Sequence, residues 1–168
     1  PSTDLDELAA VETLLKSYNE NHCGFEFAVV QGEGMLHIVP RQARGLSGNL
    51  EPVKPVLDTL ITIEPTERTF GTLLEEVFKK VSVATNSHVE ICSASQNMLN
   101  PPKTTIGGSG KTARSILEQL ILEGGGGLSW TLLYGPDDKE YCFNISQVST
   151  PNQGLILLPR PLPAGKPC

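Results

Sequence analysis

Residues 103–145, KTTIGGSGKTARSILEQLILEGGGGLSWTLLYGPDDKEYCFNI, decide the fold of this chain. A β-branched strand opens the stretch, and the Gly-Gly-Ser-Gly segment that follows breaks it. Apolar side chains then recur at helical spacing over residues 113–121, which predicts a helix with one buried face. Two segments of alternating apolar residues, 128–132 and 141–145, flank a turn. The stretch therefore predicts a strand, a helix and a β-hairpin.

A shorter version of this pattern lies upstream at a constant offset of 43 residues. The segments that start at Thr69 and at Thr112 share one pattern. It begins with Thr, has Ser or Thr three residues later, and continues with two large aliphatic residues, Glu, and then Glu or Gln. Two unrelated amphipathic helices can look alike, but the matched polar positions favour an internal repeat. We predict two equivalent strand–helix–strand units. The apolar face of the hairpin, with Trp130, Tyr141 and Phe143, is expected beneath the third helix.

The remaining segments complete the expected organisation. A helix from Asp4 to Tyr18 and a hairpin make up residues 1–40, residues 41–55 are expected to be a connector, residues 56–146 carry the tandem units, and residues 147–168 form a Pro-rich tail. Within the tandem region we expect a strand over 56–63 and a helix capped by Thr66. In the tail, the apolar run 155–158 is a candidate edge strand. The fold class is α+β, with three helices packed on small mixed or antiparallel sheets as βαβ and βαββ units and an N-terminal helix–hairpin.

Composition excludes some classes of function. The 168 residues carry a net charge of −6 with scattered Lys and Arg, so we expect no nucleic-acid partner. No apolar run approaches the roughly 20 residues that span a bilayer, so we expect no transmembrane segment. The opening Pro1-Ser2-Thr3 suggests a trimmed or processed chain.

Four cysteines, Cys23, Cys92, Cys142 and Cys168, are spaced too widely for a zinc knuckle or a thioredoxin-type pair. The favoured interpretation is small buried hydrophobic residues plus a loose thiol in the tail. Disulfides in an exported protein are the alternative.

The segment from Gly107 to Thr112 nearly matches a phosphate-binding P-loop. Its Walker pattern requires glycine where the chain has Thr105, and no apolar run ending in Asp supplies a magnesium ligand. The favoured interpretation is a Gly-rich turn between strand and helix, with the cap near Ser109 or Gly110. Binding of a nucleotide or another anion at the helix start, beside Lys111, remains an alternative.

Other motifs for chemistry are weak. The three histidines are far apart, and no nucleophile elbow occurs, so we expect neither a metal site nor an enzyme, and no cofactor. Trp130, Tyr134 and Tyr141 are the candidate interaction residues, and binding of cell-wall glycan through them is a further alternative. Such aromatic residues more often form the core face of a hairpin.

Over residues 56–145 the expected elements run strand–helix–strand, loop, strand–helix–strand–strand. This order resembles the secretin and TonB N-terminus short (STN) domain and the related N-terminal modules of secretins. The residues that carry the likeness include Thr112, the pair Ile116-Leu117 and the segment Gly127-Leu128-Ser129-Trp130. The helix and hairpin of residues 4–39 lie outside the resemblance. The resemblance implies a periplasmic or otherwise exported, non-enzymatic module that binds a protein partner. Strand addition at a sheet edge is the physical route by which such a fold would bind.

Overall fold

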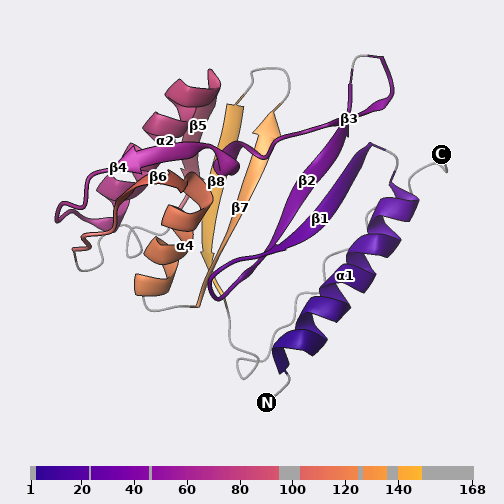
Figure 1. The fold of residues 1–168 in the computed structure, drawn as a ribbon, viewed down its shortest axis with the longest axis horizontal. Coiled ribbons are helices and arrows are strands. Elements are labelled where there is room, and N and C mark those ends of the chain that lie inside the picture. The colour runs from indigo at the N-terminus through magenta and orange to yellow at the C-terminus, as the bar shows by residue number, and fades with distance from the viewer. Residues whose placement is uncertain are drawn as a thin grey trace. The chain divides into compact units, whose positions relative to one another are not determined.

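Two groups of helices and strands make up the structure, a computed structural model that describes residues 3–22, 24–45, 47–94, 103–124, 127–135 and 140–148 (Figure 1). The contacts between residues separate two compact units, with the boundary between Pro55 and Val56. Each unit contains helices and strands, and the described part has three α-helices, which confirms the α+β class.

The first unit places one helix beside a three-stranded antiparallel sheet of order β1-β2-β3. Its elements are α1 (Thr3–Asn21), β1 (Phe25–Gln31), β2 (Leu36–Arg44) and β3 (Leu50–Pro52). The predicted helix and hairpin are confirmed. The prediction that 41–55 is only a connector is wrong, because β2 continues to Arg44 and β3 pairs with it. Pro40 fits inside β2 because it lies opposite Phe27, next to a bulge in β1, where no N–H is needed.

The described part of the second unit contains two α-helices and two small sheets. Its elements are the 3₁₀ turn η1 (Val56–Asp58), β4 (Leu60–Ile63), α2 (Phe70–Thr85), β5 (His88–Ser93), β6 (Gly108–Thr112), α4 (Ala113–Glu123), β7 (Leu128–Gly135) and β8 (Glu140–Gln147). Strands β4 and β6 pair antiparallel with each other. In the second sheet the order is β5-β8-β7, with β5 parallel and β7 antiparallel to β8. The predicted hairpin of β7 and β8 is therefore confirmed.

The two helices of this unit have the same caps and the same buried face. Thr69 and Thr112 each accept a hydrogen bond from the backbone N–H three residues later, as N-caps do. Five buried positions of α2 recur in α4 at the same offset of 43 residues. The pairs are Phe70 and Ala113, Leu73 and Ile116, Leu74 and Leu117, Val77 and Leu120, and Phe78 and Ile121. The predicted helical repeat therefore holds for the caps and for the face that packs into the core.

The strands that precede these helices differ from the predictions. The cap of α2 is Thr69 rather than Thr66, and residues 56–58 form a 3₁₀ turn rather than the start of a strand. The Gly-rich segment was expected to be a turn, but from Gly108 onward it is strand β6. Close backbone packing explains the glycine that precedes β6, because a Cβ at Gly107 would lie 2.6 Å from the carbonyl oxygen of Ile63.

The hairpin packs its aromatic face into the core of the second unit. The rings of Trp130 and Phe143 stack with centroids 5.6 Å apart, which confirms that they share a face. Phe143 is fully buried and contacts Phe78 at 4.9 Å between ring centroids. The ring that meets Phe143 therefore comes from α2, whereas the sequence pattern predicted a contact with α4.

Candidate interaction surfaces

The first candidate surface is the free edge of β5. Among the described strands β5 pairs only with β8, in the order β5-β8-β7, so one side of its backbone faces away from the sheet. The N–H of Val89 donates to the Ser82 hydroxyl of α2 at 3.0 Å, which shows that Val89 has its backbone groups on the outward side. Because successive residues alternate, the N–H and C=O of Ile91 also point outward. In the described part of the chain they have no hydrogen-bond partner.

A groove of about 470 Å³ runs between this edge and α2. The side chains of Phe78, Val89 and Ile91 give it an apolar floor, and Val83 of α2 stands beside it with 80% of its surface exposed. Polar side chains line the rest: Glu75, Lys79, Ser82, His88 and Glu90. An apolar floor beside unpaired strand backbone is the arrangement that accepts an added strand.

A disulfide fixes β5 to its neighbour. Cys92 of β5 and Cys142 of β8 are bonded, with their Cα atoms 5.5 Å apart. Cys92 is exposed, so the interpretation of these two cysteines as small buried hydrophobic residues is wrong. Cys23 and Cys168 lie outside the described residues. The covalent link holds the edge strand in place while its other side stays open.

Two of the three predicted interaction residues lie together at one end of the hairpin. Tyr134 and Tyr141 are cross-strand partners with ring centroids 4.6 Å apart, and Tyr134 is 51% exposed. Burial raises the pKa of Tyr141, and the neighbouring Tyr134 raises it further. Trp130 lies four residues before Tyr134 on the same face of β7, half-buried against Phe143. The three rings therefore pack on aromatic neighbours of the hairpin and do not form one flat exposed platform.

The Gly107 to Thr112 segment does not form a phosphate cradle. Thr112 and Lys111 pair with Leu60 and Ile61 of β4, and Gly108 pairs with Ile63 beyond a bulge. The Lys111 ammonium group donates to the Gln119 side chain of α4 at 3.3 Å. A P-loop needs free amides that converge on an anion, whereas three residues of this segment are paired with β4, with the left-handed Gly110 in the bulge between them.

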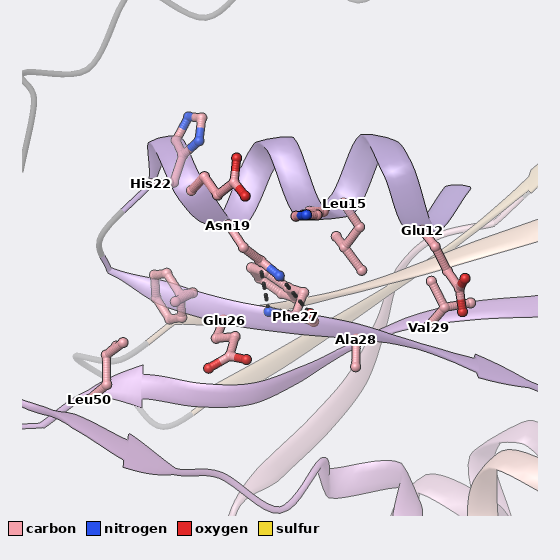
Figure 2. A pocket seen from close by; sticks show the side chains of 12 residues that line it. Glu12, Leu15, Asn19, His22, Glu26, Phe27, Ala28, Val29 and Leu50 are labelled. Carbon is pink, nitrogen blue, oxygen red and sulfur yellow. Dashed lines mark hydrogen bonds between the residues drawn. The ribbon is translucent and has the colours of Figure 1, made fainter. Parts of the chain in front are cut away.

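The second candidate surface lies in the first unit, between α1 and the free edge of β1 (Figure 2). This groove of about 550 Å³ is lined by consecutive residues of β1 from Phe25 to Val29 and, at one end, by Leu50 of β3. Leu15 and Asn19 point from α1 toward the strand. The Asn19 carboxamide donates to the Phe27 carbonyl at 2.8 Å and accepts from the Phe27 N–H at 3.0 Å. Asn19 therefore pairs with Phe27 as a residue of a neighbouring strand would.

Sequence reasoning missed the residues that define both grooves. Asn19 carries a weak signal, because it continues the apolar stripe of α1 four residues after Leu15 and is polar. Ser82 and Val83 carry no such signal in the sequence, because only the pairing partner of β5 decides which edge of that strand is free. Among the described residues no cluster of three or more His, Cys, Asp or Glu could hold a metal ion. None of the described helices is long and apolar enough to cross a membrane.

Comparison with protein-family models, with curated proteins and with solved structures gave no match for this chain.

Proposed function

We propose that this chain is a non-enzymatic interaction module of an exported protein, and that it binds a protein partner by adding the partner's extended segment to β5. The observation that carries the proposal is the edge of β5 that no other described strand pairs with, beside the groove with an apolar floor that α2 lines. Backbone hydrogen bonds to Ile91 would supply affinity, and alternate apolar side chains of the partner would enter the groove. The outward N–H of Val89 is already bound by Ser82, so the added strand would begin beyond it.

The Cys92–Cys142 bond supports the exported part of the proposal. Disulfides persist in oxidising compartments such as the periplasm and the extracellular space, and are rare in the cytosol. This pair joins neighbouring strands that are 50 residues apart in the sequence. The proposed compartment is accordingly periplasmic or otherwise extracytoplasmic.

The order of elements supports the likeness to the STN domain as part of this proposal. From β4 to β8 the described elements run strand, helix, strand, strand, helix, strand, strand, which is the order that carries the resemblance. The proposed role extends to the second unit only, since α1 and its sheet lie outside the resemblance. Strand addition at β5 would be the way in which this unit performs that role.

Selection from a displayed library of random peptides tests the proposal and does not require the partner to be identified first. We expect the full chain to enrich extended peptides with apolar residues at every second position, because a strand turns alternate side chains to one face. Val83→Glu places a charge beside the groove at an exposed helix position and is expected to abolish that enrichment while the chain stays folded.

The matched control is Ala84→Glu, one residue further along the same helix and also exposed, but outside the groove. Its selected peptides should match those of the unsubstituted chain. No enrichment by the full chain, or equal enrichment by the Val83→Glu chain, would rule out the β5 edge as the binding site.

A further inference from the structure

The disulfide of the second unit presents one of its two sulfurs to solvent more than the other. Cys92 of β5 is exposed, whereas its partner Cys142 of β8 is half-buried. The neighbouring positions Val89 and Phe143 point into the core, so by alternation the bond lies on the opposite face of the sheet. Thiol–disulfide exchange requires access to the attacked sulfur, and here that access is greater at Cys92.

The two sulfurs also have different polar neighbours. The Asn144 carboxamide, two residues further along β8, donates a hydrogen bond to the Cys142 Sγ at 3.9 Å. The Glu90 Oε1 lies 3.7 Å from the Cys92 Sγ. An N–H donor stabilises a sulfur that gains negative charge, whereas a carboxylate destabilises it. When the S–S bond breaks, the electron pair should therefore go to Cys142.

The charged groups of this sheet determine which thiols can approach the bond. Strands β5, β7 and β8 contain no Lys or Arg, and their carboxylates are Glu90 and Glu140. Both are exposed on the face of the disulfide, since Glu90 pairs with Cys142 and Glu140 precedes Cys142 by two residues. The His88 ring lies 3.4 Å from the Glu90 carboxylate. A thiolate is an anion, so this face repels it unless a positive charge beside the sulfur cancels that charge.

We propose that the Cys92–Cys142 bond is a site of thiol–disulfide exchange for thiols that carry a positive charge near the sulfur. The incoming thiolate attacks the Cys92 Sγ and forms a new S–S bond there, while the Cys92–Cys142 bond breaks. Cys142 leaves as a thiolate beside the Asn144 N–H and then takes a proton from solvent. A second thiol attacks the incoming sulfur of this mixed disulfide, and Cys92 leaves with the electron pair. Two thiols are thereby oxidised to a disulfide, and the two cysteines are reduced.

This inference does not depend on the proposed function. Strand addition uses the outward backbone edge of β5 and the groove beside α2, whereas the exchange uses the sheet face on which Cys92 is exposed. A chain that selects no peptide could still react with thiols at Cys92. The two proposals therefore fail separately.

Exchange with three small thiols in the folded chain, at about pH 8 where histidine is neutral, tests the charge preference. The attacking forms of cysteamine, 2-mercaptoethanol and 2-mercaptoethanesulfonate carry no net charge, one negative charge and two negative charges. Glu90→Gln should accelerate 2-mercaptoethanesulfonate about fivefold and 2-mercaptoethanol about twofold, and should change cysteamine little, because it removes a charge close to the attacked sulfur. Glu75→Gln, an exposed position of α2 across the sheet, should change none of the three rates. Equal responses of the three thiols to Glu90→Gln would overturn the inference.

Trapping the intermediate tests the direction of attack. When the reaction is stopped early with N-ethylmaleimide, peptide mass mapping should find the probe thiol on Cys92 and the maleimide on Cys142. The reverse labelling would overturn the inference. A rate that stops rising with thiol concentration and equals the rate of unfolding would do the same, because the bond would then react only in the unfolded chain.

The leaving sulfur has its own variant. Asn144→Ala should slow the exchange about fivefold, because the departing Cys142 sulfur loses its hydrogen-bond donor. A folding defect would instead expose the bond and accelerate the exchange. Ser146→Ala, two residues further along the same face of β8, is the matched control and should leave the rate unchanged. An Asn144→Ala chain that reacts as fast as the Ser146→Ala chain would contradict the assignment of Cys142 as the leaving group.

Discussion

The two grooves are built alike, yet they differ in how far the helix closes the edge strand. In both, a polar side chain of the helix binds outward backbone groups of the strand. The Asn19 side chain forms hydrogen bonds with both the N–H and the C=O of Phe27, whereas the Ser82 hydroxyl accepts one only from the N–H of Val89. The edge of β5 therefore keeps more of its hydrogen-bonding capacity than the edge of β1 does at the corresponding place.

The helices that line the two grooves differ even more, in how deeply their side chains are buried. Six side chains of α2 are buried, among them Leu74 at 1% exposure, whereas Leu15 of α1 is only half-buried. A fully packed helix gives the β5 groove a fixed wall, and fixed walls reduce the entropy lost when an extended segment binds. The difference indicates that β5 is the more pre-organised of the two surfaces.

The largest expected effect tests the difference in packing. Leu74→Ala should lower the free energy of unfolding of the second unit by about 2–5 kcal/mol, because it leaves a cavity in a filled core. Leu15→Ala should cost the first unit about 1 kcal/mol, since a half-buried side chain loses less contact. Urea denaturation checks both, with the fluorescence of the single tryptophan, Trp130, reporting the second unit and amide exchange within α1 reporting the first unit. Equal costs would mean that the two helices pack equally well.

The disulfide should have the next largest effect. Replacing Cys92 and Cys142 together by Ala should reduce the free energy of unfolding of the second unit by about 2–4 kcal/mol, because the bond closes a long loop in the unfolded chain. Reductant should destabilise the unsubstituted chain by a similar amount and leave the doubly substituted chain unaffected. A second unit whose denaturation midpoint does not respond to reductant would show that the bond does not form.

Smaller effects are expected from the side chains that cover the strand edges. Asn19→Ala removes two hydrogen bonds and should cost about 1–3 kcal/mol, whereas Ser82→Ala removes one and should cost about 0.5–1.5 kcal/mol. Hydrogen exchange provides the local readout, since the amides of Phe27 and Val89 should each lose protection in the corresponding variant. If Ser82→Ala proves the more costly of the two, the contrast between a closed and an open edge fails.

The smallest effect concerns pH. Tyr141 has a pKa raised above the ordinary value of 10.0 in the folded chain, chiefly by burial and also by Tyr134. Its stabilising contribution is fully present below pH 10 and is lost as the pH rises through the folded pKa, because the unfolded chain gives up the proton first. Denaturation midpoints measured between pH 9 and pH 12 should fall less steeply for Tyr141→Phe than for the unsubstituted chain. Identical slopes would place Tyr141 in a solvated environment.

Local periodicity predicted the helices of the second unit well, because their buried faces are written in neighbouring residues. The stripe from Phe70 to Val81 and the matching stripe from Ala113 to Ile121 are both buried as expected. Strand β6 could not be predicted, since glycine has little preference for strands, and the partner of β6 lies about 50 residues away. Non-local pairing decides the structure of such a segment.

The candidate site was predicted only in outline. Strand addition at an exposed edge was an expectation, but the interaction residues named from the sequence were aromatic residues of the hairpin. The edge that lies beside the α2 groove belongs to β5, and the identity of an edge strand depends on the sheet order β5-β8-β7. Ile91 and Val83 look like ordinary apolar residues until that order is known.

Exchange at two amides of one strand tests the central claim most directly. In the free chain the Val89 amide is held by Ser82 and should be protected, while the Ile91 amide faces solvent and should exchange quickly. On addition of a peptide selected on the full chain, we predict that the Ile91 amide becomes protected and that the Val89 amide changes little. A peptide that binds the chain while the Ile91 amide still exchanges at its free rate would contradict strand addition at β5.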